Sequence, residues 1–274
     1  MSKIVDLLIG KQELLPPKLP PDVAPLVEWN DALWTSVLQR HVSLNGMVDY
    51  IGIQHDLVFL QLVELISRQS PTSHPELFLS ETHVLSFWIN AYNILTIWAV
   101  VSDGITTSVQ DSNVSGWIRI NPGQDFFVAN RIQIGGTWMN LYDLENKIIR
   151  VIGDARIHAA INCASHSCPI LENIAFNAKD LDDRLSLSMK RMINSDRHLQ
   201  VDTTKGIVYA SLIFKWYKSD FDARYTKQLF DYWITFAEES LLSQLQLAQT
   251  NRFRIEWLPY DWRLNKIDGS FSNT

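Results

Sequence analysis

The sequence predicts an α+β fold that is predominantly helical, with short antiparallel strands grouped in hairpins. Three observations lead to this expectation. Long segments repeat their apolar residues every three or four positions, which is typical of helices that bury one face. Two shorter segments alternate residues around turn motifs, which is typical of hairpins. Helices and strands do not alternate regularly along the chain, which argues against a doubly wound parallel sheet.

A proline-rich arm precedes the helical part of the chain. The stretch from residue 16 to residue 25 holds five prolines, which exclude a regular helix or an inner strand. We therefore expect residues 1–25 to form an extended arm. No linker, repeat or low-complexity tract interrupts the apolar segments that follow, so residues 26–274 are expected to form a single domain.

Three helices are expected in the first half of this domain. Apolar spacing predicts helices over 26–41 and 56–67, and a third over 81–101 that Ser80 or Thr82 would cap. The third helix is apolar nearly all round, which predicts the central buried helix of the domain. Two asparagines inside it argue against a span across a bilayer.

Further elements follow in the second half. A polar loop is expected over 103–121, and residues 126–138 read as a hairpin that turns at Ala129-Asn130 and exits through a Gly-Gly pair. A second hairpin is expected around Lys205-Gly206. Apolar spacing predicts helices over 141–152 and 180–196 and a C-terminal helix over 229–246. A short strand that ends in an aromatic turn is expected over 253–262.

Composition narrows the functional class. The chain has 274 residues, a net charge of −6 and a pI near 5.6, so it lacks the clustered basic charge of a nucleic-acid-binding surface. Two cysteines do not make a disulfide framework, and a reducing compartment is the simpler interpretation. The N-terminus does not have the pattern of a signal peptide. We expect a cytoplasmic protein without a membrane span and without a nucleic-acid partner.

The stretch HAAINCASHSCP, residues 158–169, concentrates the reactive side chains and contains both cysteines. Four interpretations are open. It is a thiol catalytic site in which a histidine lowers the thiol pKa, a buried strand in which Cys163 is a small hydrophobe, a zinc site, or a Cys163–Cys168 redox pair. The spacing matches none of the usual paired zinc ligands, so no metal is expected.

Spacing alone does not select the nucleophile. A straight strand would separate His158 from Cys163 by ~17 Å and point them to opposite faces, so a dyad requires the backbone to bend. Cys168 is also a candidate nucleophile. Ser165 or Ser167 could cap a helix that starts at CPILENIAF, and the first turn of a helix favours a thiolate.

Three other groups deserve a functional and a structural interpretation. Asn90 and Asn93 share a face of the predicted buried helix, where they would tie a loop to the core or donate to an oxyanion. Tyr260 lies in an aromatic cluster with the segment WYKSDF, where rings would plug the core or contact a ligand. For Glu145, taken as an isolated residue, the default interpretation is a solvated charge on the surface.

Six segments together resemble the domain of unknown function 547 family. They appear in order over about residues 45 to 265: GMVDYIGI, FWINAYNILTI, LYDLENKIIR, DARIHAAINCASHSCPIL, IFKWYKSDF and LPYDWRLN. The resemblance implies a motif that maps to His158, Cys163, Ser167, Cys168 and Pro169. Because serine replaces the second cysteine in some members, it favours Cys163 as the nucleophile.

The resemblance also raises Glu145 to a candidate orienting residue, although Leu144 stands where the family pattern has isoleucine. The order Glu, His, Cys would suit a permuted version of a papain- or transglutaminase-like core, by analogy of fold. We therefore expect a thiol hydrolase or acyl or peptidyl transferase that acts on a peptide or a small thiol-containing peptide such as glutathione. No cofactor is expected. Cys163 would attack, His158 would carry the proton, and Asn90, Asn93 or backbone near Ser165 would bind the oxyanion.

A second hypothesis is a binding module that holds a small peptide, a thiol ligand or a protein partner in the same pocket without turnover.

Overall fold

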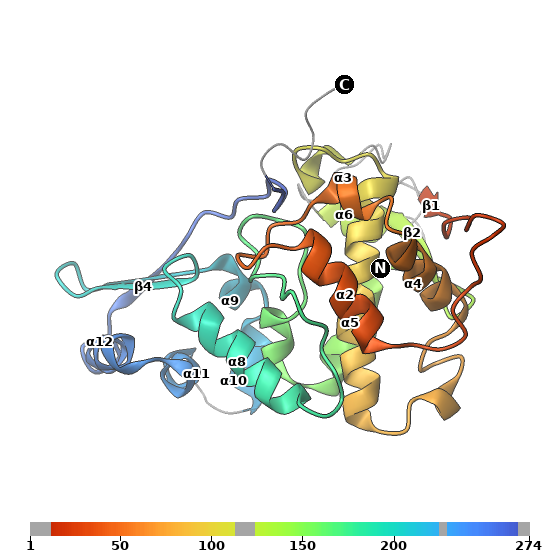
Figure 1. The fold of residues 1–274 in the computed structure, drawn as a ribbon. Coiled ribbons are helices and arrows are strands. Elements are labelled where there is room, and N and C mark those ends of the chain that lie inside the picture. The colour runs from red at the N-terminus through yellow and green to blue at the C-terminus, as the bar shows by residue number, and fades with distance from the viewer. Residues whose placement is uncertain (1–11, 113–123, 225–228, 268–274) are drawn as a thin grey trace, which may run out of the picture. The chain divides into compact units, whose positions relative to one another are not determined.

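The chain folds into two compact units, which we describe from a computed structural model that covers residues 12–112, 124–224 and 229–267 (Figure 1). Unit 1 comprises Met1–Ile149, Ile161–Leu181 and Trp262–Thr274, and unit 2 comprises Arg150–Ala160 and Asp182–Asp261. The chain therefore passes between the units four times. Helices dominate both units and each holds one small sheet, which confirms the predicted α+β class. Whether residues 26–274 unfold as one domain stays a prediction.

Unit 1 combines helices with a three-stranded sheet. In the sheet, β2 pairs in parallel with β1 and antiparallel with β3. The elements are β1 (Gln12–Leu14), α2 (Asp31–His41), α3 (Tyr50–Ile53), α4 (Leu57–Arg68), α5 (Glu81–Ser102), α6 (Gln124–Ala129), β2 (Asn130–Ile134), β3 (Thr137–Asn140) and α7 (Leu141–Asp143), with 3₁₀ turns at Pro75–Leu77 and Val109–Asp111 and a π-helical turn at Leu144–Ile149.

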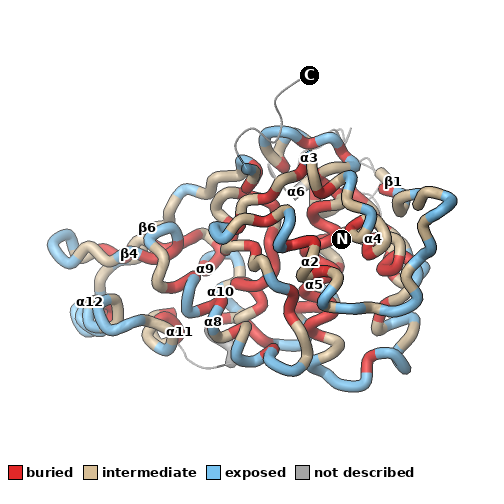
Figure 2. The backbone as a smooth tube through the Cα atoms, in the orientation of Figure 1, coloured by how far each residue is buried: buried red, intermediate tan, exposed pale blue. Residues whose placement is uncertain are grey.

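Helix α5 is the core of unit 1, as predicted. Ser80 caps it by accepting a hydrogen bond from the His83 amide, and almost every residue from Leu85 to Val100 is buried (Figure 2). The helix is long and apolar enough to cross a membrane, but 83% of its most apolar window is buried within the protein. That burial is what the core helix of a soluble protein shows.

The first predicted hairpin is shifted along the sequence. Residues before Asn130 form helix α6, so Ala129-Asn130 is not a turn, and the chain reverses at Gly135-Gly136 between β2 and β3. Both glycines have positive φ, 54° and 79°, which a two-residue hairpin turn favours. Their amides donate to the Ile66 and Ser67 carbonyls, which fixes the turn against the end of α4.

Unit 2 has its own sheet and its own core. Strand β5 pairs antiparallel with β4, which confirms the second hairpin, and in parallel with β6. The elements are 3₁₀ turns at Arg150–Ile152 and Ala155–Ala159, then α8 (Leu181–Ile193), β4 (Leu199–Asp202), β5 (Ile207–Ala210), α9 (Leu212–Trp216), α10 (Lys218–Arg224), α11 (Leu229–Phe236), α12 (Glu239–Thr250) and β6 (Arg254–Trp257).

The single C-terminal helix predicted over 229–246 is two helices. Between α11 and α12 the Asn194 side chain donates to the Phe236 carbonyl at 2.9 Å and accepts from the Glu238 amide at 2.7 Å. These bonds satisfy backbone groups that a continuous helix would have paired internally. The break therefore depends on a side chain more than forty positions earlier, which helical periodicity does not reveal.

Candidate functional site

The two cysteines form a disulfide in unit 1, Cys163–Cys168. The segment around them is not the buried strand that HAAINCA suggested. Residues Ala155–Ala159 form a 3₁₀ turn, and an irregular loop that carries both cysteines follows. Ala164 adopts a positive φ of 60°, so the loop folds sharply back immediately after Cys163.

Buried asparagines fix the backbone of this cysteine loop. The Asn93 side chain on α5 accepts the Asn162 amide at 2.8 Å. The Asn162 side chain donates to the Pro169 carbonyl and accepts the Ala164 amide, both at 2.8 Å. Asn265 donates to Asn162 Oδ1 at 3.3 Å and accepts from the Tyr50 hydroxyl at 2.7 Å. The loop is thus held from both ends by hydrogen bonds that water cannot readily replace.

The same bonding explains why no helix begins at Cys168. The Asn162 side chain donates to the Pro169 carbonyl. The Asn90 side chain on α5 donates to the Phe176 carbonyl at 2.7 Å and accepts from the Phe176 amide at 3.0 Å. The stretch from 168 to 177 is non-helical because side chains supply the partners that helical bonds would have supplied. The predicted helix N-terminus at Cys168 is therefore wrong. Asn90 and Asn93 both tie loops to the core here, and their oxyanion role stays a prediction.

The two sulfurs have different surroundings. Cys168 is buried, 4% exposed, whereas Cys163 is partly exposed. The Cys163 amide donates to Cys168 Sγ at 3.0 Å, and the buried Ser165 hydroxyl lies 3.1 Å from Cys163 Sγ. Donors of this kind favour a negatively charged sulfur. Ser167 is partly exposed beside them in the loop.

His158 lies in unit 2, buried between aromatic rings. It belongs to the 3₁₀ turn Ala155–Ala159, which Asp154 caps by accepting the Arg156 amide. Its imidazole stacks on Tyr217 with centroids 4.0 Å apart and contacts Phe221 at 5.5 Å. Nε2 lies 2.8 Å from the Asp220 carboxylate, and the side chain is 1% exposed. The carboxylate that contacts this histidine is therefore Asp220 of α10.

Arg150 completes the arrangement around Asp220. Its guanidinium donates two hydrogen bonds of 2.6 Å to the carboxylate and lies 5.0 Å from the Tyr217 ring centroid. Burial raises the pKa of Asp220, but the hydrogen bonds from His158 and Arg150 outweigh it and hold the pKa well below the ordinary range. An ionised Asp220 accepts a hydrogen bond from Nε2–H, which leaves Nδ1 as the acceptor nitrogen of the imidazole.

Glu145 lies in unit 1, on the π-helical turn after α7. It is 7% exposed, and the Tyr92 hydroxyl of α5 donates to its Oε2 at 3.3 Å. Its Oε1 has no hydrogen-bond partner among the described residues. A buried carboxylate with so few donors is costly, and π-helical turns are frequent at functional sites. Glu145 thus remains a candidate site residue, and its role as the group that orients His158 stays a prediction.

Tyr260 lies in unit 2, partly buried. Its ring contacts Trp216 at a centroid distance of 4.8 Å, and Trp216 is 45% exposed. The pair is an aromatic surface feature next to the end of β6.

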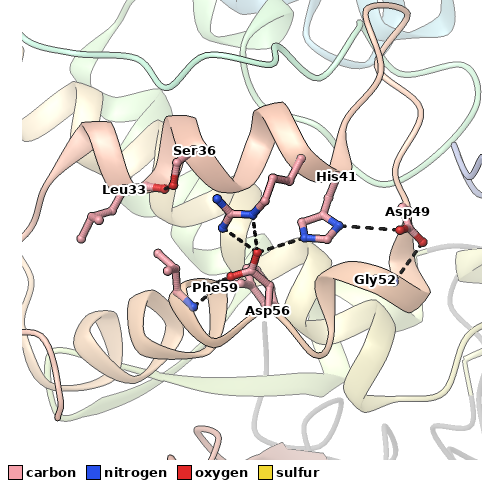
Figure 3. Close-up of polar contacts among 9 residues, drawn as sticks. Leu33, Ser36, His41, Asp49, Gly52, Asp56 and Phe59 are labelled. Carbon is pink, nitrogen blue, oxygen red and sulfur yellow. Dashed lines mark hydrogen bonds and ion pairs between the residues drawn. The ribbon is translucent and has the colours of Figure 1, made fainter. Parts of the chain in front are cut away.

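A separate polar cluster in unit 1 surrounds His41 (Figure 3). Its Nε2 lies 3.0 Å from Asp56 and its Nδ1 lies 3.7 Å from Asp49, while Arg40 donates to Asp56 at 2.6 Å. Both carboxylates also cap helices: Asp49 accepts the Gly52 amide of α3, and Asp56 accepts the Val58 and Phe59 amides of α4. The cluster anchors the start of two helices to the end of α2.

No group of three or more His, Cys, Asp or Glu side chains in the described part of the chain is arranged to hold a metal ion.

Comparison with known proteins gives one family: residues 77–193 match the family described as "Protein of unknown function, DUF547". The matched residues make up less than half of the chain, so the resemblance to this family is shown over that stretch alone. No curated protein and no solved structure matches it.

The DUF547 match spans Glu145, His158 and both cysteines, as well as the asparagines of α5. The partners that sequence reasoning missed lie partly beyond it. Asp220 and Tyr217 belong to WYKSDF, and Arg150 ends LYDLENKIIR. Residue type in these two segments does not by itself predict that the three side chains meet around His158.

Proposed function

We propose that this chain is a thiol enzyme, a hydrolase or an acyl or peptidyl transferase, in which Cys163 in its reduced form is the nucleophile and His158 is the general base. The observation that carries the proposal is the fixed orientation of His158. A buried imidazole with an ionised carboxylate on one nitrogen and an aromatic ring against its face is arranged as a base, not as a surface charge.

We assign the orienting role to Asp220. The Asp220 carboxylate fixes the imidazole in one tautomer and stabilises the imidazolium that forms when the proton is taken up. Arg150 holds Asp220 through two hydrogen bonds. A rigid cysteine loop supports the nucleophile, because an immobilised sulfur loses little entropy when it reaches its target.

The reaction has two steps. The Cys163 thiolate attacks a carbonyl carbon, the carbon–sulfur bond forms, and His158 delivers its proton to the departing amine. Water or a second nucleophile then attacks the thioester, His158 accepts a proton from it, and the thiol is released with the acyl product. The expected substrate class is a peptide or a small thiol-containing peptide such as glutathione.

The test compares variants of the full chain after reduction with a dithiol. We expect Cys163 to react with iodoacetamide at neutral pH faster than an ordinary exposed thiol, and the rate to fall about 10²-fold or more in His158→Ala. Asp220→Asn and Glu145→Gln form a matched pair that removes one carboxylate each. A larger loss in Asp220→Asn supports the assignment, whereas a larger loss in Glu145→Gln returns the orienting role to Glu145.

Product analysis with short peptides and glutathione separates catalysis from binding. We expect cleaved or transferred product that Cys163→Ala does not form. Thermal stabilisation by the same compounds without any product, together with ordinary reactivity of Cys163, would replace the enzyme with the binding module.

A further inference from the structure

We propose that Cys163–Cys168 is a thiol–disulfide exchange site, which a small thiol opens by attack on Cys163 and which Cys168 closes again as the resolving residue. The inference goes beyond acyl transfer, because it assigns the cysteine loop a second chemistry with a monothiol as the substrate class.

The first argument is the asymmetry of exposure. An attacking thiolate must approach along the sulfur–sulfur axis, so it needs the far side of one sulfur to be accessible. Cys163 is partly exposed, whereas Cys168 is 4% exposed. Attack is therefore directed to Cys163, and Cys168 is the leaving group.

The second argument is the position of the hydrogen-bond donors. The Cys163 amide points at Cys168 Sγ, 3.0 Å away, where negative charge develops as the bond breaks. A donor there lowers the energy of the departing thiolate and speeds its departure. The Ser165 hydroxyl lies 3.1 Å from Cys163 Sγ, where it stabilises the Cys163 thiolate in the second step.

The third argument is the rigidity of the loop. The bonds from Asn93 and Asn162 leave the backbone between the cysteines fixed, so the two sulfurs stay close after reduction. Short separation, five residues, gives the resolving thiol a high effective concentration. Re-formation of the disulfide therefore outcompetes accumulation of a mixed disulfide.

The chemistry balances with two equivalents of thiol. A first thiolate bonds to Cys163 Sγ as the Cys163–Cys168 bond breaks, and Cys168 leaves as a thiolate that takes up a proton. A second thiolate attacks the sulfur of the bound thiol, which releases a small-molecule disulfide and the Cys163 thiolate. The protein gains two electrons and the two thiols lose them.

The experiment uses the reduced full chain, oxidised glutathione as the probe, and mass spectrometry without reductant. We expect the wild type to recover its internal disulfide without a lasting adduct. Cys168→Ser should accumulate one glutathione on Cys163, at least about tenfold faster than Cys163→Ser accumulates it on buried Cys168. Equal rates in the two variants, or faster modification of Cys163→Ser, would overturn the assignment of roles.

A measurement on the wild type protects the test against misfolded variants. The oxidised protein is treated with reduced glutathione, quenched with N-ethylmaleimide and sequenced by fragmentation. Because the disulfide re-forms quickly, we expect only a minor trapped fraction, with glutathione on Cys163 and maleimide on Cys168. The reverse pattern, or no opened protein even at a large excess of glutathione, would contradict the proposal. If the disulfide exchanges but reduced Cys163 forms no acyl-enzyme, the exchange site is supported and the hydrolase proposal is wrong. If reduced Cys163 forms an acyl-enzyme but the disulfide is inert, the hydrolase is supported and the exchange proposal is wrong.

Discussion

Asp56 performs three tasks with one carboxylate. It caps α4 through the Val58 and Phe59 amides, and it pairs with both Arg40 and His41 (Figure 3). Burial raises the pKa of Asp56, but hydrogen bonds from Arg40, the Phe59 amide and His41 outweigh it and lower the pKa below its ordinary value of 3.8. Ionised Asp56 is therefore favoured in the folded chain.

Replacing this residue tests the cap and its pH dependence together. We expect Asp56→Ala to lower the free energy of unfolding by about 1–2 kcal/mol at neutral pH, through loss of the cap and its ion pairs. Because the pKa of Asp56 is lower in the folded chain, its carboxylate stabilises the fold at pH values above the unfolded-state pKa. This stabilisation is lost as the pH falls through the folded-state pKa. The gap between wild type and variant should therefore shrink below about pH 4 in urea denaturation.

The matched control is Glu64→Ala. Glu64 pairs with Arg68 on the exposed side of the same helix, and such pairs contribute about 0.5 kcal/mol or less. A loss from Asp56→Ala no greater than that from Glu64→Ala, or a gap that does not change with pH, would contradict this account.

At the scale of elements, the sequence located helices better than it located their interruptions. The buried helix α5, the amphipathic α4 and α8, and the β4–β5 hairpin were predictable because each repeats its own local period. The first hairpin, the α11–α12 break and the cysteine loop were not, since remote side chains or glycine turns decide them. Asn194 and Asn90 act on backbone far from them in sequence.

The glycine turn between β2 and β3 gives a test at this scale. Both glycines have positive φ, but a Cβ on Gly135 would lie 2.3 Å from Ser70 Oγ and one on Gly136 would meet nothing within 4 Å. We expect Gly136→Ala to cost only the backbone strain, about 1–2 kcal/mol. Gly135→Ala should cost more, because strain and crowding add. Equal losses in thermal unfolding would show that the serine side chains move aside freely.

At the scale of the whole molecule, neither unit is one continuous stretch of chain. Unit 2 needs Arg150–Ala160 beside Asp182–Asp261, and the intervening residues belong to unit 1. Because the chain must close these loops before either unit is complete, folding of one unit is tied to folding of the other. We therefore expect one cooperative unfolding transition, in line with the single domain predicted from residue 26.

Phe214 provides the probe for this coupling. It is fully buried in the core of unit 2, against Phe221 and Trp233. Phe214→Ala should lower stability by about 3–5 kcal/mol. Hydrogen exchange of amides in α5 and in α11 should then accelerate together, although α5 lies in unit 1. Acceleration confined to α11 would instead show two independently unfolding domains.

The sequence by itself determined the α+β class, the buried asparagine helix, and the concentration of chemistry at His158 and the two cysteines. These features depend on local periodicity and on residue type. Only the tertiary structure decided that the cysteines are bonded to each other, that asparagines fix their loop, and that Asp220 and Arg150 surround His158. Several of those contacts join residues 62 to 103 positions apart, and no local pattern encodes which distant side chain will satisfy a buried polar group.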